Sequence, residues 1–467
     1  MSKSETLEIR HSKGNMASYG FAKFLNEFID MAFASFGFYY YESEIGLNVW
    51  LVGLGYIIFA IYNAINDPLV GYTTNRPFKF TKKWGRRFPW ILFGGFFWIL
   101  SYYLIFSPPA VSTETMSGSL IIFAWLIFAT CLFDTFASIF FVNFASLFPD
   151  KFRSVEERRT ATGIGTFIGI FGVALGAIIP PLFITFGKLN SYIIQAGAMI
   201  LIGLVVLALS IPGCREDQIL IDRYLTTYDD KAKRESFFGT LKVAMKQKTF
   251  VVFIITYTLY RGLVILIQGS IPYLVRFVLE KKASATILLS AGFLIGALIS
   301  IPFWIILAKK TNNNRKVMII AGFAITIFTI PLIFITHYET LIIAMILWGV
   351  CLGGFWVMLA PVLADVIDES VVKTGKREEG IYNGFQQFFG RLGIMIQAIT
   401  FVLVHSFTGF VEGASTQSPQ AVWGIQIHFA LIPMILIFLG TFIFWKWYDL
   451  TPDKVKINQE KVKEMGL

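Results

Sequence analysis

Charged residues are scarce in this chain of 467 residues: they make up 15% of it, against about 25% in ordinary soluble domains. Hydrophobic residues make up 55%, and the mean hydropathy is +0.65. Apolar runs of roughly 20 residues recur along the whole sequence. The composition therefore excludes an ordinary soluble domain and indicates a polytopic membrane protein.

Cysteine and histidine are also rare. The three cysteines show no metal-ligand spacing, and we interpret them as helix packing residues: Cys131, Cys214 and Cys351. The four histidines are dispersed and form no nucleophile–base pattern: His11, His337, His405 and His428. A membrane enzyme acting on lipid-linked substrates is therefore poorly supported, and we expect neither enzymatic activity nor a cofactor.

The sequence has no basic-aromatic cluster outside its short loops, although its formal net charge is +10. We interpret this excess as loop charge and expect no nucleic-acid partner. Residues 1–15 are polar and lack a short apolar core followed by a small-residue cleavage site. They are not typical of a cleavable signal peptide.

The length rule for a bilayer core predicts an all-α membrane protein with about twelve spans. These are 17–41, 46–73, 88–107, 118–148, 160–187, 190–212, 248–279, 283–308, 315–336, 339–367, 380–407 and 422–448. A long charged segment divides them into two six-helix bundles. The predicted domains are residues 1–212, a cytoplasmic linker at 213–247, and residues 248–467, which include a cytoplasmic tail.

Short loops rich in lysine and arginine predict the orientation, because such loops stay on the cytoplasmic side. They lie at the N-terminus and in the stretches 74–87, 151–159, 309–316 and 373–377. The opposite-side loops at 42–44, 108–118 and 408–420 are poor in basic residues. Both termini are therefore expected to be cytoplasmic. Separately, small residues four apart in span 160–187 predict close helix packing: Gly165, Gly169, Gly172 and Gly176.

The stretch 63–95 contains a carboxylate inside the second predicted span, followed by a cationic loop and a third span. Asn63 and Asp67 are four residues apart, with Asn66 between them. Charge at mid-bilayer costs at least about 2.5 kcal/mol, so such groups normally face a cavity, a partner or an ion. We predict a functional site at Asp67.

The first span carries further polar residues at helical spacing. Lys23 and Glu27 are four apart, as are Asn26 and Asp30. Each pair can meet on one helix face, and Lys23 with Glu27 can equally form a purely structural ion pair.

The second half also has polar groups within its predicted spans. Arg261 interrupts span 248–279, and span 380–407 carries Gln387 and Arg391. Arg391 either needs an anionic partner or reaches toward the cytoplasm. Trp356 lies in span 339–367 between a glycine pair and Pro361, where it can pack or stack on a solute.

Three stretches together resemble the melibiose-permease-like glycoside–pentoside–hexuronide:cation symporters of the major facilitator superfamily. The first runs from Asn63 through Asp67-Pro68 to Gly71 and then Gly85-Arg86-Arg87-Phe88-Pro89-Trp90. The others are Ala364-Asp365-Val366-Ile367-Asp368, with downstream residues as far as Asn383-Gly384, and Gln417-Ser418-Pro419 with Gly424-Ile425. The resemblance spans nearly the whole chain.

This resemblance implies a twelve-helix fold, an alternating-access cavity and solute transport coupled to sodium or protons. By position, Asp67 matches a cation-site aspartate, and Asn63 replaces a second one. Glu27 and Trp356 match residues associated with the solute, and Arg391 falls close to a lysine of helix 11. The carboxylate expected on helix 4 falls near Phe141, with Asp134 two turns earlier, and the sugar-binding arginine of helix 5 falls near Thr166.

We therefore predict a secondary active transporter that couples Na⁺ or H⁺ to a small solute, sugar-like or glycoside-like by resemblance. The alternatives are symport or uncoupled flux of an organic anion or a lipid-like amphiphile. The predicted cation site comprises Asp67, Asn63, Asn66 and Glu27, whose oxygens suit a hard cation. The predicted solute site comprises Glu27, Asp30, Trp356, Arg391, Gln387 and Arg261.

Cationic and acidic groups predicted on the cytoplasmic side suggest a gate. Ion pairs between the two halves would hold the inner side shut when the protein faces outward. The alternative is that these charges only set the orientation of the chain in the membrane. The residues are Arg76, Arg86, Arg87, Asp365, Asp368, Arg377 and Glu379. We expect a monomer in the plasma or inner membrane, whose partners are the bilayer, the solute and the coupling cation.

Overall fold

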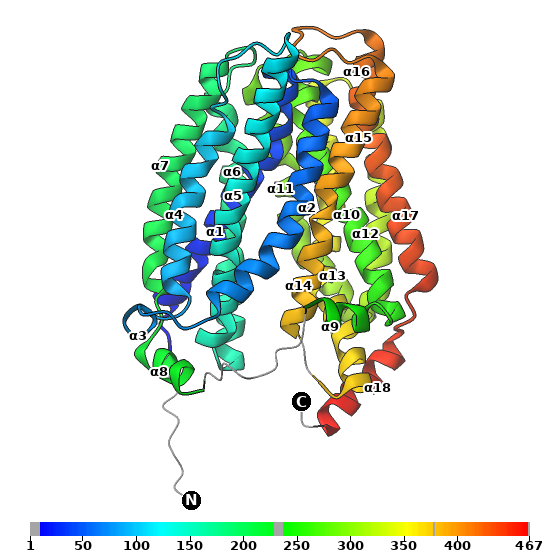
Figure 1. Ribbon diagram of the computed structural model, residues 1–467. Coiled ribbons are helices and arrows are strands. Elements are labelled where there is room, and N and C mark those ends of the chain that lie inside the picture. The colour runs from blue at the N-terminus through cyan, green and yellow to red at the C-terminus, as the bar shows by residue number, and fades with distance from the viewer. Residues whose placement is uncertain (1–9, 228–236, 377–378, 466–467) are drawn as a thin grey trace, which may run out of the picture.

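The computed structural model is described for residues 10–227, 237–376 and 379–465 (Figure 1). These residues form helices and connections, and no β-strand occurs among them. The prediction of an all-α protein is confirmed.

The helices of the first half are α1 (Lys13–Tyr39), α2 (Val49–Thr74), α3 (Thr81–Trp84), α4 (Phe88–Ile105), α5 (Met116–Lys151), α6 (Val155–Phe183) and α7 (Leu189–Cys214). The predicted linker carries α8 (Gln218–Thr227) and α9 (Phe237–Ala244). The second half has α10 (Lys248–Tyr273), α11 (Thr286–Thr311), α12 (Asn314–Thr329), α13 (Tyr338–Thr374), α14 (Glu379–Gly390), α15 (Leu392–Thr408), α16 (Pro419–Gln426), α17 (Ile432–Trp447) and α18 (Pro452–Glu464).

Five shorter segments extend or connect these helices. Three are π-helical turns, η1 (Tyr40–Glu44), η2 (Leu274–Val278) and η5 (Ile427–Leu431), and two are short 3₁₀ turns, η3 (Ala283–Ala285) and η4 (Pro331–Ile333). The π-turns continue α1 and α10 and join α16 to α17.

Short polar side chains start several helices by accepting a hydrogen bond from a backbone N–H group of the first turn. Ser12 accepts from Asn15 at α1, and Ser154 accepts from Glu157 at α6. Such caps satisfy donors that a helix leaves unpaired. Local sequence therefore determines where these helices begin.

Eleven segments of the described chain are long and apolar enough to cross a membrane. α1 is not among them because Lys23, Glu27 and Asp30 interrupt its apolar sequence. Its 27 residues nevertheless pack along α6 and α7, so α1 takes the place of the first predicted span.

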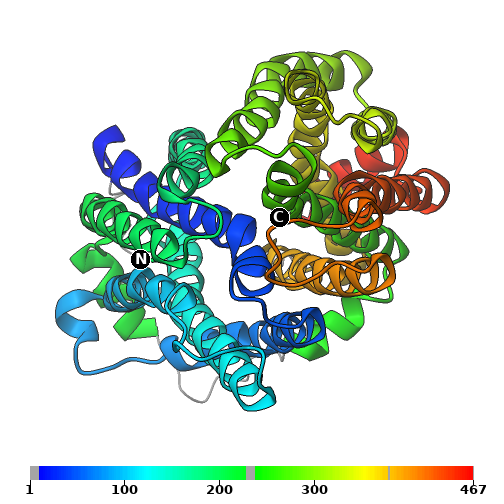
Figure 2. The same ribbon diagram turned by 90° about the horizontal axis from the view of Figure 1, so that it is seen from above.

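The spanning helices form two bundles. Figure 2 shows α1 to α7 gathered on one side and α10 to α17 on the other. In the first bundle α1 packs on α6 and α7, and α5 packs on α2 and α4; in the second, α13 packs on α11 and α12, and α17 on α10 and α12. The bundles meet where α2 contacts α15, α1 contacts α10, and α6 contacts α11. The predicted two-bundle fold is confirmed, whereas the domain boundaries at 212/213 and 247/248 remain a prediction.

The molecule has two distinct ends in Figure 1. α3, α8, α9 and α18 lie at the lower end, which we call the basic side because it carries the arginine-rich loop between α2 and α4. The connections at 106–115 and 409–418 lie at the other end, which we call the opposite side.

The glycines of α6 allow α1 to approach closely. A Cβ atom on Gly172 would lie 2.4 Å from the backbone oxygen of Phe24, and one on Gly176 would lie 2.4 Å from that of Phe28. These distances leave no room for a side chain. The predicted close packing is therefore confirmed at both positions.

The predicted span 380–407 is not one continuous helix. α14 ends at Gly390, α15 begins at Leu392, and Arg391 forms a turn between them. Glycines flank this turn because α10 lies against it: a Cβ on Gly390 would come within 2.9 Å of the Tyr257 ring. Glycine weakens a helix interior, which explains the interruption that hydrophobic periodicity did not predict.

Candidate cation and solute site

A cavity of about 270 Å³ lies between the two bundles. Helices α1, α2, α5 and α6 line it from the first bundle, and α10, α11, α13, α14 and α15 line it from the second. All six residues of the predicted solute site line this cavity: Glu27, Asp30, Arg261, Trp356, Gln387 and Arg391. The fold thus brings together residues that lie far apart in the sequence, while their individual roles remain predictions.

Arg391 connects the bundles by contacting two carboxylates of the first bundle. Its Nη2 atom lies 2.9 Å from Oδ2 of Asp67 on α2, and its Nη1 atom lies 3.6 Å from Oδ1 of Asp134 on α5. Ser138 donates a hydrogen bond of 2.5 Å to the other oxygen of Asp67. The Asp134 side chain is 3% exposed, whereas those of Asp67 and Arg391 are about a quarter exposed. One permanent cation therefore faces two acids.

Asn63 and Asn66 converge on the same buried carboxylate. Asn63 donates its amide to Oδ1 of Asp134, and Asn66 donates to Oδ2 at 3.1 Å. The carbonyl oxygen of Asn63 is buried and has no hydrogen-bond partner among the described residues. An unpaired buried acceptor beside a carboxylate suits a hard cation such as sodium.

Sequence reasoning missed Asp134 as a member of this group, because the resemblance placed the helix 4 carboxylate near Phe141. A simpler signal was available: Asp134 is the only charged residue of α5 before Asp150. An isolated carboxylate that deep in a span marks a functional site by default.

Of the two side-chain pairs predicted on the first helix, α1, only one forms. Lys23 donates from Nζ to Thr166 on α6 at 3.2 Å, and the described residues show no ion pair between Lys23 and Glu27. Asn26 donates to Asp30 at 3.5 Å, so that second predicted pair does meet. Glu27 lines the cavity, but in the described chain no hydrogen bond links it to Asp67, so its assignment as a cation ligand remains a prediction.

Aromatic residues form one wall of the cavity on the side of the second bundle. Trp356 donates its indole N–H to the hydroxyl of Tyr260, and the Tyr260 ring stacks on Phe355 with centroids 4.5 Å apart. This contact orients the indole, while Trp356 keeps part of its surface open to the cavity. Arg261 also lines the cavity, and its buried Nε atom has no hydrogen-bond partner within the part of the chain that the structure describes.

A second cavity, of about 950 Å³, leads from this site toward the basic side. Asp67, Gln387 and Arg391 line its inner end, and Asp150 and Arg158 line the end near the basic side. Much of its wall is aromatic: Tyr19, Phe141, Phe144, Phe148 and Phe388. Contacts between the bundles close the opposite side, including the hydrogen bond from Gly413 N to Glu42 O at 3.2 Å. The structure is therefore open toward the basic side.

In this conformation four of the gate residues have partners in their own bundle. Arg86 contacts Asp150 at 2.6 Å, and Asn314 donates to Asp365 at 3.0 Å. The other arginines behave similarly: Arg76 donates to Tyr72, and Arg87 donates to Asn75 and Asn143. Asp368 lies one turn beyond Asp365 on α13. Arg377 and the side chain of Glu379 lie outside the described residues, and the proposed pairing between bundles concerns the outward-facing state, so the gate remains a prediction.

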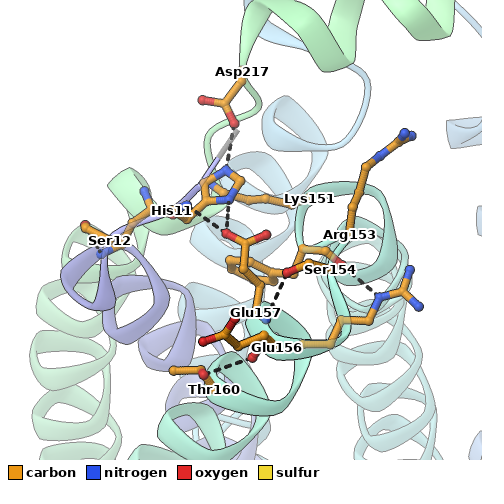
Figure 3. A network of polar contacts seen from close by, with 12 residues as sticks. His11, Ser12, Lys151, Arg153, Ser154, Glu156, Glu157, Thr160 and Asp217 are labelled. Carbon is orange, nitrogen blue, oxygen red and sulfur yellow. Dashed lines mark hydrogen bonds and ion pairs between the residues drawn. The ribbon is translucent and has the colours of Figure 1, made fainter. Parts of the chain in front are cut away.

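On the basic side, a separate network of polar contacts holds the start of α1 in place (Figure 3). His11 contacts Glu157 of α6 through Nδ1 at 3.2 Å and Asp217 through Nε2 at 2.9 Å. The hydrogen bond with His11 holds the pKa of the Asp217 carboxyl below its usual value. The network joins α1, α6 and the connection after α7.

The family model described as "MFS/sugar transport protein" matches residues 18–452 of this chain. The chain belongs to this family. It is 22% identical over 448 residues to the sodium-dependent lysophosphatidylcholine symporter 1 of Gallus gallus, a match that covers 86% of this chain and 80% of that protein. It is 23% identical over 446 residues to the isoprimeverose transporter of Lactiplantibacillus pentosus, covering 92% and 88%.

Solved structures agree on the fold of this MFS protein. The nucleoside transporter NupG, in a mutant form, superposes with a TM-score of 0.62 at 12% identity, covering 92% of this chain and 100% of that one. A D-xylose-proton symporter gives 0.59 at 12% identity, covering 93% and 96%. The predicted major facilitator fold is confirmed, and the family, fold and relatives are those of multi-pass membrane transporters rather than enzymes.

Proposed function

We propose that this MFS protein is a cation-coupled symporter whose coupling ion binds among Asp67, Asp134 and the carbonyl oxygen of Asn63. The observation that carries the proposal is the contact of one guanidinium, that of Arg391, with two carboxylates of the other bundle. Two acids and one permanent cation leave one excess negative charge, which Na⁺ or H⁺ neutralises. Neutralisation matters here because burying net charge is unfavourable.

The coupling follows from the positions of these groups. The carboxylates belong to α2 and α5, and Arg391 occupies the break between α14 and α15. A cation that binds the carboxylates weakens the attraction holding Arg391. The guanidinium is then available to the solute, and the two bundles are less strongly linked at this point. Interrupted helices at mid-membrane sites serve such roles in many transporters.

The solute we favour is sugar-like or glycoside-like. Glu27, Asp30, Arg261 and Gln387 offer hydrogen-bond acceptors and donors for hydroxyl groups, and Trp356 offers a ring face for stacking. A cavity of about 270 Å³ that is lined by both polar groups and aromatic rings suits a compact, hydroxyl-rich molecule. The relative named as an isoprimeverose transporter supports this choice by its name.

A lipid-like amphiphile is the second candidate, and the larger cavity favours it. Its aromatic wall could take an acyl chain, while Arg391 faces an anionic headgroup at the inner end. The relatives named as sodium-dependent lysophosphatidylcholine symporters support this alternative by name. We further propose that the basic side is cytoplasmic and that a monomer acts in the plasma or inner membrane.

The test is gradient-driven uptake into proteoliposomes, with a glycoside or a lysophospholipid as solute and with imposed Na⁺ or H⁺ gradients. We expect accumulation that needs one of the two gradients and is lost in Asp67→Ala, which still folds. Asp449→Ala is the matched control, because Asp449 pairs with Lys454 on the surface, away from the cavity. Wild-type accumulation in Asp67→Ala would contradict the proposal, and equal flux without any gradient would indicate an uncoupled facilitator.

A further inference from the structure

On the opposite side, five polar side chains are buried between the two bundles, and we call them the Glu42 cluster: Glu42, Ser270, Tyr273, His405 and His428. Oε1 of Glu42 lies 2.7 Å from Nδ1 of His405, and Oε2 accepts a hydrogen bond from the hydroxyl of Tyr273. Both carboxylate oxygens are thus held by the second bundle. The Glu42 side chain is 0% exposed and that of His405 is 1% exposed.

The cluster extends to a second imidazole. Nδ1 of His428 lies 2.7 Å from the hydroxyl oxygen of Ser270, and the two imidazole rings have centroids 4.9 Å apart. Across the described ranges, the Nε2 atoms of both histidines are buried without a hydrogen-bond partner. A buried nitrogen with no partner is an unused position where a proton can bind or leave.

Irregular helix turns place these groups. Glu42 lies in η1 and His428 in η5, and η2 carries the neighbouring Arg276. These are the three π-helical turns of the described chain. Such turns interrupt regular helix hydrogen bonding and are frequently found at functional sites.

The other charged and titratable groups facing the cluster already have partners. Arg276 contacts Glu44 at 2.9 Å and donates to the hydroxyl of Tyr39, and Tyr192 also donates to Glu44. The ring of Tyr39 meets that of Tyr273. Because Arg276 and Glu44 neutralise each other, the charge of the cluster is decided by Glu42 and its two histidines.

Electrostatics favours one bound proton while the opposite side is closed. An ionised Glu42 with two neutral histidines carries one negative charge away from water, and one added proton brings the cluster to neutrality. Opening the opposite side separates Glu42 of the first bundle from Tyr273 and His405 of the second. Water then solvates each group separately, so no buried negative charge remains that the shared proton has to neutralise.

We propose that the Glu42 cluster is a proton-binding site, distinct from the site at Asp67, and that its proton stabilises the closed state of the opposite side. This inference rests on the alternating access of the proposed symporter. Acidification on the opposite side therefore favours the closed state and slows reopening. Since one proton is linked to the change, the ratio of open to closed molecules falls by up to about tenfold per pH unit.

The experiment measures the distance between spin labels across the opposite side, at cysteines replacing Met116 at the start of α5 and Gln420 at the start of α16. The three native cysteines are first replaced. In the purified full chain we expect the long-distance population to decrease from about pH 8 to about pH 6.5, because a solvated histidine of the open state also binds a proton below that pH. A distribution that does not change over this range overturns the proposal.

Two variants identify the group responsible. Glu42→Gln keeps a hydrogen-bond acceptor but removes the charge, so the distance should become independent of pH. Glu412→Gln is the matched control, because Glu412 also links the bundles, through Asn48 at 3.1 Å and Val49 N at 2.9 Å, and the described residues give it no histidine partner. It should keep the wild-type dependence. Wild-type pH dependence in Glu42→Gln overturns the proposal.

His405→Asn provides an independent test should Glu42→Gln fail to fold, since it removes the imidazole that shares the proton. It too should abolish the pH dependence, and retention of the dependence overturns the proposal. Repeating the measurement in Asp67→Ala separates this inference from the transport proposal. The distance readout needs no solute, so failure of symport leaves its result interpretable.

Discussion

Arg391 illustrates how one side chain depends on both bundles. Its guanidinium reaches Asp67 and Asp134 with two different nitrogens, which a planar fork allows and a single ammonium group does not. Removing it leaves Asp134 buried beside Asn63 and Asn66 without its cation. The resulting loss of stability should be measurable when no coupling ion is present.

We expect Arg391→Ala to destabilise the purified protein when no coupling cation is present. Breaking a buried pair typically costs about 3–5 kcal/mol, and the partial exposure of Asp67 and Arg391 places this loss toward the low end. Adding the cation should raise the melting temperature more in Arg391→Ala than in wild type, because the cation replaces the lost charge. Arg391→Lys should lie between the two, and thermal unfolding with and without Na⁺ measures all three.

The control is Arg261→Ala, because Arg261 lines the same cavity but forms no ion pair with either aspartate, both of which the structure describes. Its response to the cation should match wild type. Equal responses in Arg391→Ala and wild type would show that Arg391 and the cation do not share the carboxylates. Full solute affinity in Arg391→Ala would remove this residue from the solute site and leave Trp356 as the stronger candidate.

At the scale of helices, α1 is the element on which the site and the closure both depend. It carries Glu27 and Asp30 at the cavity and continues into η1 at the Glu42 cluster. Its position is determined by the glycines of α6 and by the network around His11 (Figure 3). Substitutions at either contact should therefore change the stability of the protein, although these contacts lie far from the cavity.

Gly172→Ala should destabilise the protein by about 1–3 kcal/mol, the typical cost of overpacking a well-filled contact. The new methyl group would lie 2.4 Å from the backbone oxygen of Phe24, which cannot move without shifting α1. Gly163→Ala on the same helix is the matched control, because nothing in the described structure lies within 4 Å of its added methyl group. It should be neutral or stabilising, since alanine favours helix by roughly 1 kcal/mol over glycine. Equal effects of the two substitutions on thermal unfolding would contradict the described packing.

The network at His11 predicts a pH-dependent stability. Its hydrogen bond lowers the pKa of Asp217 in the folded state, so this carboxylate contributes stability above its unfolded pKa of about 3.9. That contribution is lost as the pH falls through the lower folded value. Asp217→Asn should therefore be less stable than wild type at pH 7, and the difference should shrink at lower pH.

The effect should be small, because the Asp217 side chain is 39% exposed and solvent screens the pair. Denaturation at several pH values measures it. Asp222→Asn on α8 serves as the comparison, since Asp222 accepts a hydrogen bond from Gln218 and, within the described residues, has no histidine partner. A difference between wild type and Asp217→Asn that does not change with pH would contradict the prediction.

The whole molecule is closed on the opposite side and open on the basic side. The Glu42 cluster and the contact of Glu412 with Asn48 join the bundles at one end, while the cavity of about 950 Å³ separates them toward the other. Transport by alternating access requires a second state with this arrangement reversed. In that state the gate arginines would exchange their present partners for acids of the other bundle.

Asp365→Asn tests this exchange. If Asp365 pairs across the bundles in the outward-facing state, neutralising it should shift the population toward the present state, which is open on the basic side. A cysteine replacing Ala145, which is exposed and lines the larger cavity, should then react faster with a thiol reagent applied from the basic side. Asp453→Asn at the start of α18 is the control. Unchanged accessibility from both sides in Asp365→Asn would instead support the alternative that these charges only set the orientation in the membrane.

The amino-acid sequence by itself determined the membrane class, most span ends to within a few residues and the polar residues inside the spans. These properties are local: the length of an apolar run, a cap such as Ser154 or a carboxylate such as Asp67 can be recognised without knowing what lies nearby. The same reasoning predicted the close contact of α1 with α6, because glycine spacing is also a property of one helix.

Only the tertiary structure decided which of these groups meet. Arg391 contacts both Asp67 and Asp134. Lys23 donates to Thr166 instead of pairing with Glu27. The helix is interrupted next to Gly390, which packs against α10. The Glu42 cluster joins positions 363 residues apart, and no periodicity within one helix encodes that distance. The physical reason is that the cost of a buried charge is set by its neighbours, and these come from other helices.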